Sequence, residues 1–161
     1  MAMKFLDGTT LKDLVIGSSL KLDRFIDVAV QVLDGLEAAH AENVIHRDIK
    51  PVNIFVTATG RRVKILDFGL AKINVPLHVK VGAGSSAEYV TTGGALGTMP
   101  YMSPEQVLGK PMDAPSDLLS FGVTLYEMAI GKMPFQGDTT GVLFLSIVQE
   151  PPVPAATCHR G

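Results

Sequence analysis

The sequence contains one cysteine, no tryptophan and few aromatic residues, which make up 6% of its 161 residues. With Cys158 alone, the chain cannot form an intrachain disulfide or a structural zinc site built from cysteines. Its 14 basic and 16 acidic residues leave a net charge of −2, which argues against a nucleic-acid-binding surface. No apolar run reaches the roughly 20 residues that span a bilayer, and the N-terminus lacks the features of a signal peptide. We therefore expect a soluble cytoplasmic protein with no membrane span in this chain and no nucleic-acid partner.

Apolar residues make up 47% of the chain, enough to build a packed core in one domain. Their helical spacing predicts a long amphipathic helix over residues 20–41. A strongly apolar segment, 116–131, ends in glycine and predicts a buried central helix. A further helix is predicted over 139–149, and the serine, proline and glutamate at 103–105 predict the start of a short one. The fold is therefore expected to be mainly α-helical.

A short hairpin is the main β structure that the sequence predicts. Two runs of β-forming residues, 53–57 and 63–66, flank a turn at Gly60. Residues 74–97 then lose all periodicity and are rich in glycine, serine and threonine. A mobile loop of this length inside a compact domain is uncommon and is often functional.

The densest group of chemically active residues is HRDIKPVN, at positions 46–53, between the first long helix and the hairpin. Asp48 could accept a proton from a hydroxyl group, and Lys50 could neutralise a phosphoryl group. The amide oxygen of Asn53 could bind a hard cation. After the hairpin, the DFG sequence that begins at Asp67 offers a second carboxylate for Mg²⁺. Together these groups suit phosphoryl transfer.

The order of the motifs is more specific than any one of them. HRDxKPxN, then DFG after a hairpin, then SPE after a threonine-bearing loop, form the signature set of protein kinases. The chain resembles a eukaryotic-like serine/threonine protein kinase, of a type found in bacteria, over nearly its whole length. The resemblance implies an α+β protein-kinase-like fold in which residues 1–161 form a partial kinase domain. Its parts would be the hinge (3–8), the catalytic loop (46–53), the activation segment (67–105) and C-lobe helices (20–41, 116–131 and 139–149).

The resemblance implies that the γ-phosphate of ATP is transferred to a protein serine or threonine, with ATP and Mg²⁺ as cofactors. Asp48 would be the catalytic base and Lys50 would stabilise the γ-phosphate, and this lysine favours serine or threonine over tyrosine. Asn53 and Asp67 match the two magnesium ligands.

Other positions match nucleotide-binding and substrate-binding parts of the family. The backbone of Phe5 and Leu6 and the side chain of Phe55 would contact adenine. Thr98 would contact the base and the lysine, which again indicates serine/threonine specificity.

Control of activity is implied by Arg47, the arginine before the catalytic aspartate. In the family this residue binds a phosphorylated activation loop, since phosphate forms charge-assisted bonds with arginine. Thr91 and Thr92 are the candidate phosphorylation sites, and a kinase dimer could carry out that reaction.

A last group of matches is structural. His46 and Phe68 match the C-lobe half of the regulatory spine, and Gly69 permits an unusual backbone conformation. Asp117 would brace the backbone of the turn at His46. Glu105 normally pairs with an arginine that would lie beyond this sequence, so we expect it to be buried without a partner.

No glycine-rich loop and no strand lysine of the kinase type occur in the sequence. We therefore expect a C-lobe with the N-lobe absent, weak binding of Mg²⁺-ATP and no activity from the 161 residues alone. One alternative is a non-catalytic, kinase-like module for protein interaction, or a truncated remnant. Another is a small-molecule phosphotransferase of related fold, against which Lys50 and the DFG sequence argue. His40, His78 and His159 are expected to be exposed.

Overall fold

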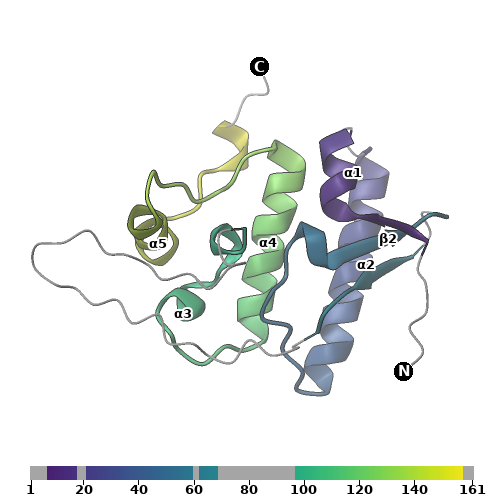
Figure 1. Ribbon diagram of the computed structural model, residues 1–161, viewed down its shortest axis with the longest axis horizontal. Helices are drawn as coiled ribbons and strands as arrows, with labels where there is room; N and C mark the ends of the chain where they lie inside the picture. The colour runs from purple at the N-terminus through teal and green to yellow at the C-terminus, as the bar shows by residue number, and fades with distance from the viewer. Residues whose placement is uncertain (1–6, 18–20, 60–61, 69–96, 158–161) are drawn as a thin grey trace, which may run out of the picture.

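The computed structural model describes residues 7–17, 21–59, 62–68 and 97–157. Within these ranges the chain is mainly helical with one small sheet, in agreement with the sequence (Figure 1). The helices are α1 (Leu11–Gly17), α2 (Leu22–Ala41), α3 (Pro104–Val107), α4 (Ala114–Ile130) and α5 (Thr140–Gln149), with short 3₁₀ helices η1 (Pro51–Asn53), η2 (Met99–Tyr101) and η3 (Ala155–Thr157). None of the helices in these ranges combines the length and apolar character that crossing a bilayer requires.

The sheet has three antiparallel strands in the order β1 (Gly8–Thr10), β2 (Ile54–Thr57) and β3 (Val63–Ile65). The predicted hairpin is β2 and β3, and β1 adds a strand on the other side of β2. Gly8 is required for this pairing, because a Cβ atom there would lie 2.2 Å from the carbonyl oxygen of Val56. It would also lie 2.7 Å from the ring of Phe55. The absent side chain thus lets β1 approach the hairpin closely.

Helix α2 packs through a narrow apolar stripe. Its buried residues, Val28, Val32 and Leu36, recur every four positions and therefore lie on one face. That face contacts the sheet and α4, in one cluster with Ile54. The helix runs close to the predicted 20–41 range.

Helix α4 lies in the middle of the molecule, with α1, α2 and the sheet on one side and α3 and α5 on the other (Figure 1). It begins two residues before the predicted start, because Asp113 caps it through a capping box with Ser116. It ends at Gly131, whose left-handed conformation (φ 75°) terminates the helix.

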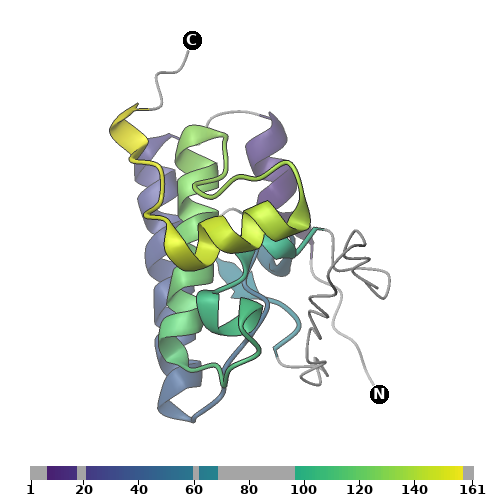
Figure 2. The same cartoon turned by 90° about the vertical axis from the view of Figure 1, so that its left-hand side faces the viewer.

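Two hydrophobic clusters lie against α4. Phe121 belongs to the cluster with α2 and the sheet, whereas Val123 belongs to the cluster with α5 and η2. Helix α5 lies across α4 in Figure 2 and contributes Phe144 and Ile147 to this second cluster. Its cap is Thr139, whose hydroxyl accepts a hydrogen bond from the N–H of Val142 (3.3 Å). The central helix therefore joins both halves of the core.

Candidate active site

Asp117, in the first turn of α4, supports the loop of residues 46–53. One carboxylate oxygen accepts a hydrogen bond from the backbone N–H of His46 (2.8 Å), and the other accepts one from that of Arg47 (2.8 Å). Asp117 is 1% exposed, and charge-assisted bonds of this kind are stronger than neutral ones. They fix Arg47 in a left-handed conformation (φ 69°), which costs a residue with a Cβ atom about 1–2 kcal/mol. Helix α4 therefore determines the path of the loop.

The ring of His46 is buried and links the loop to the end of β3. Its Nδ1 accepts a hydrogen bond from the N–H of Asp48 (3.2 Å), and its Nε2 lies 2.8 Å from the carbonyl oxygen of Leu66. Because an N–H only donates and a carbonyl only accepts, the ring is the neutral tautomer with its proton on Nε2. Phe68 packs edge to face on this ring, with centroids 4.8 Å apart. His46 is thus a packed, hydrogen-bonded residue.

Asp48 and three other polar residues form one connected group. Its Oδ2 lies 3.0 Å from Nζ of Lys50 and accepts a hydrogen bond from Nδ2 of Asn53 (3.1 Å). Asn53 also donates to the main-chain carbonyl oxygen of Asp48 (2.8 Å), so that it holds both the main chain and the side chain of the aspartate. Lys50 Nζ donates to the hydroxyl of Thr98 (2.7 Å). The structure thus brings Thr98, which is distant in sequence, into one group with the loop residues.

Asn53 and Asp67 lie at the same edge of the hairpin. The N–H of Leu66, next to Asp67, donates to the carbonyl oxygen of Asn53 (2.8 Å). The hydrogen bonds of the Asn53 side chain to Asp48 use Nδ2, which leaves its amide oxygen as the atom suited to a cation. Asp67 is exposed and has a left-handed backbone (φ 57°). One amide and one carboxylate oxygen fit Mg²⁺, which binds few protein ligands. Within the described ranges, no cluster of three or more His, Cys, Asp or Glu could hold a metal.

The segment that begins at Gly97 is anchored to α4. Thr98 is 3% exposed, and its carbonyl oxygen accepts from the N–H of Tyr101 (3.0 Å). The Tyr101 hydroxyl donates to Oε2 of Glu127 on α4 (2.6 Å). Burial, followed by the hydrogen bond and negative charge of Glu127, raises the pKa of Tyr101 well above its ordinary value. Thr98 is therefore held beside Lys50 by contacts with the core.

Glu105 differs from the sequence-based expectation of a buried carboxylate without a partner. It is only partly buried, and its Oε2 accepts from the hydroxyl of Ser116 (3.3 Å). A hydrogen bond from its own backbone N–H lowers the pKa of Glu105 below the ordinary 4.5. Hydrogen bonds from Ser103 and Ser116 and the charge of Lys110 act in the same direction, and burial opposes them. Glu105 thus has hydrogen-bond donors close to it in the structure.

The lowered pKa of Glu105 predicts a contribution to stability that is present near neutral pH and is lost at low pH. A carboxylate whose folded-state pKa is depressed stabilises the fold above about pH 4.5, and this contribution is lost as the pH falls through the folded-state value. Between pH 6 and pH 3, wild type should therefore lose more free energy of unfolding than Glu105→Gln in urea titrations. Glu37→Gln, at an exposed position of α2, is the matched control. Equal losses in wild type and Glu105→Gln would contradict this assignment.

Comparison with known proteins agrees with this geometry. Residues 1–156 match the family described as the protein kinase domain. The chain belongs to the protein kinase family. This finding confirms the resemblance that the HRD, DFG and SPE motifs indicated.

Several bacterial serine/threonine kinases are similar to this kinase chain. A probable serine/threonine-protein kinase of Clostridium acetobutylicum is 38% identical over 155 residues, which cover 96% of this chain and 22% of the relative. PknB of Mycobacterium tuberculosis is 36% identical over 162 residues, 100% of this chain and 24% of PknB. A probable kinase of Streptomyces coelicolor is 37% identical over 158 residues, 96% and 22% of the two chains. The chain spans about a quarter of the length of the curated relatives it matches.

Some of the predicted kinase positions lie outside the described residues. They are the adenine-contacting Phe5 and Leu6, the DFG glycine Gly69, and the candidate phosphorylation sites Thr91 and Thr92. His78 and His159 also lie outside these ranges. Their roles stay predictions. Phe55 lies on β2, half-buried, with its ring next to Gly8.

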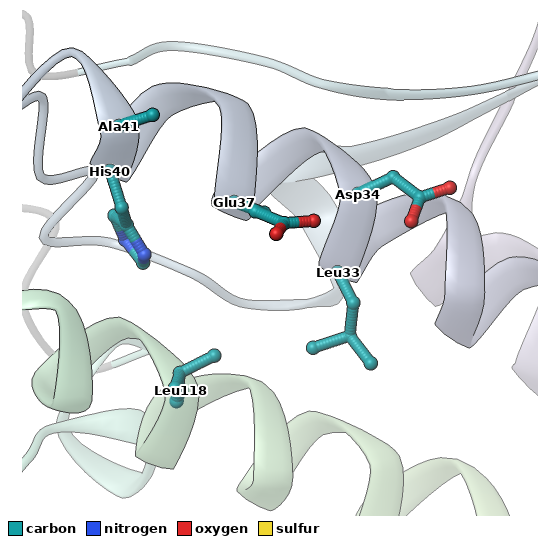
Figure 3. Close-up of a pocket in the computed structure, with 6 residues that line it drawn as sticks. All are labelled: Leu33, Asp34, Glu37, His40, Ala41 and Leu118. Carbon is teal, nitrogen blue, oxygen red and sulfur yellow. The ribbon is translucent and has the colours of Figure 1, made fainter.

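His40 is half-buried, so the expectation that it is exposed was wrong. Its Nε2 lies 2.9 Å from Oδ2 of Asp117, the same oxygen that accepts from the N–H of His46. In Figure 3 the ring points from α2 toward α4 and lines an open pocket of about 510 Å³ between these helices. Leu33 and Leu118 line the same pocket, which includes no residue of the loop 46–53. Helix α2 of the kinase therefore also supports Asp117.

Proposed function

We propose that the protein transfers the γ-phosphate of ATP to a serine or threonine hydroxyl of a protein substrate. The observation that carries this proposal is the group of Asp48, Lys50, Asn53 and Thr98. In it, a carboxylate is oriented by an amide, and an ammonium group lies 3.0 Å from the carboxylate and 2.7 Å from a hydroxyl. Family membership and the names of the relatives support the same reaction.

In the proposed reaction, the acceptor hydroxyl oxygen forms a bond to the γ-phosphorus as the bond between that phosphorus and the β,γ-bridging oxygen breaks, so that ADP leaves. Asp48 accepts the hydroxyl proton, for which its carboxylate must be ionised and oriented. Asn53 orients it through two hydrogen bonds. The charge of Lys50 stabilises the negative phosphoryl group, and electrostatic stabilisation is the main requirement of this chemistry.

Asn53 and Asp67 are the residues that would hold Mg²⁺. When bound, the ion neutralises charge on the ATP phosphates. Their place at one edge of the hairpin, set by the bond between Leu66 and Asn53, supports this assignment.

The proposal is tested by phosphoamino acid analysis. The longest product of the gene and the 161-residue chain would each be incubated with Mg²⁺, γ-labelled ATP and a general acceptor protein. We expect label on serine or threonine, because the resemblance associates Lys50 and Thr98, which are joined by a hydrogen bond, with serine/threonine specificity. Chelation of Mg²⁺ should abolish labelling.

Label confined to tyrosine or to a small molecule would contradict the proposed acceptor. A lack of transfer from both proteins would favour the non-catalytic interaction module. Transfer by the longer product alone would show that the 161 residues need further parts of the kinase domain.

A further inference from the structure

Gln106, on α3, connects the segment that begins at Gly97 to the loop of residues 46–53. Its Oε1 accepts a hydrogen bond from the backbone N–H of Ser103 (2.9 Å), which is part of the capping box of α3. Its Nε2 donates to the carbonyl oxygen of Arg47 (2.9 Å). Because an N–H only donates and a carbonyl only accepts, these two partners determine the orientation of the amide. Capping uses only one end of the side chain, and the other end reaches the loop.

The contact falls on the peptide unit that immediately precedes Asp48. The carbonyl oxygen of this unit accepts from Gln106, and its N–H donates to Nδ1 of His46 (3.2 Å). The preceding N–H, that of Arg47, donates to Asp117. Arg47 has a left-handed conformation that its side chain disfavours, so this peptide unit needs partners to keep its direction. The orientation of the 47–48 peptide determines the direction in which the Asp48 side chain leaves the main chain.

We propose that Gln106 is a positioning residue that keeps the 47–48 peptide, and through it the carboxylate of Asp48, in the orientation used for proton transfer. Asp117 holds this strained turn from α4 and Gln106 holds it from α3. Helix α3 follows the segment that contains Thr98. The same glutamine therefore joins that segment to the loop that carries Asp48. The expected effect of Gln106 on the rate rests on the proposed phosphoryl transfer. Its role in holding the 47–48 peptide does not.

Gln106→Glu removes the contact with Arg47 and keeps the contact with Ser103, so it tests the two contacts of the side chain separately. A glutamate still accepts from Ser103 and keeps the capping box, but it cannot donate to Arg47 when ionised. Gln106→Met removes both contacts at similar length. Gln136→Glu is the matched control, because it removes a side-chain amide donor to a backbone carbonyl, that of Met133 (3.2 Å), at an exposed site.

Steady-state kinetics of the active kinase should show kcat about ten-fold lower in Gln106→Glu and Gln106→Met, because misplacing a base weakens proton transfer without removing it. KM for ATP should stay within about two-fold, since the contact lies on the base. A merely structural role would lower the fraction of folded enzyme and leave the kcat of the folded part unchanged. Wild-type kcat in folded Gln106→Glu would overturn the proposal.

Amide hydrogen exchange in the 161-residue chain gives a readout that needs no activity. We expect the N–H groups of Arg47 and Asp48 to exchange about ten-fold faster in Gln106→Glu, while that of Gln106 itself, bonded to Ser103, stays protected. Exchange should be unchanged in Gln136→Glu. If wild type transfers no phosphate, this experiment alone decides whether Gln106 holds the peptide. Unchanged exchange at Arg47 and Asp48, or global unfolding of both Gln106 variants, would overturn the inference.

Discussion

Asp48→Asn is expected to lower kcat for phosphoryl transfer by about 10³-fold, because an amide cannot accept the proton of the acceptor hydroxyl. Asparagine has nearly the same shape, and its side-chain oxygen can still accept from Asn53 as the aspartate does. The affinity for ATP should therefore stay within a few-fold. Steady-state kinetics would measure kcat, and calorimetric titration with ATP would measure the affinity.

The control for this prediction is Asp138→Asn, an identical change at an exposed position between α4 and α5. It should leave both kcat and ATP affinity as in wild type. Turnover near the wild-type rate in Asp48→Asn would remove Asp48 as the base. The carboxylate would then be left with an orienting role toward Lys50.

Asp117→Ala is expected to have the largest effect on stability, a loss of about 3–5 kcal/mol in the free energy of unfolding. The alanine leaves the buried N–H of His46 and the partly buried N–H of Arg47 without their acceptor. It also removes the partner of His40. Urea denaturation of the 161-residue chain, followed by circular dichroism, would measure the loss.

Asp113→Ala is the matched control on the same helix. It removes only the N-cap of α4 and should cost about 1 kcal/mol. The two losses in free energy of unfolding differ because Asp113 caps only the end of a helix, whereas Asp117 holds the main chain of residues 46 and 47. A loss below about 1 kcal/mol in Asp117→Ala would show that the loop keeps its path without this brace.

The sequence predicted the helical fold and the hairpin because both depend on local spacing. Apolar residues at every fourth position of α2 and the cap signals around α3 do not need the rest of the chain to be interpreted. The loop of residues 46–53 could likewise be found because its polar residues lie within eight positions of one another. The start of α4 was placed two residues late, because the cap at Asp113 lies before the apolar run.

Contacts between distant segments could not be predicted in the same way. The bond from Gln106 to Arg47 spans 59 positions, and only the capping box at Ser103 has a sequence signal. Glu105 obtains its donors from Ser103 and Ser116, which motif comparison alone does not suggest. His40 had a signal that was missed, because it continues the four-residue spacing of the buried positions of α2.

The brace provided by Asp117 contacts only main-chain atoms of His46 and Arg47. Every residue except proline carries the same N–H group, so the brace does not depend on which side chain stands at position 47. The Arg47 side chain itself is exposed. The two hydrogen bonds that hold the loop are thus independent of the side chain exposed at position 47. The side chain at position 47 can therefore differ while the hydrogen bonds that hold the turn before Asp48 stay in place.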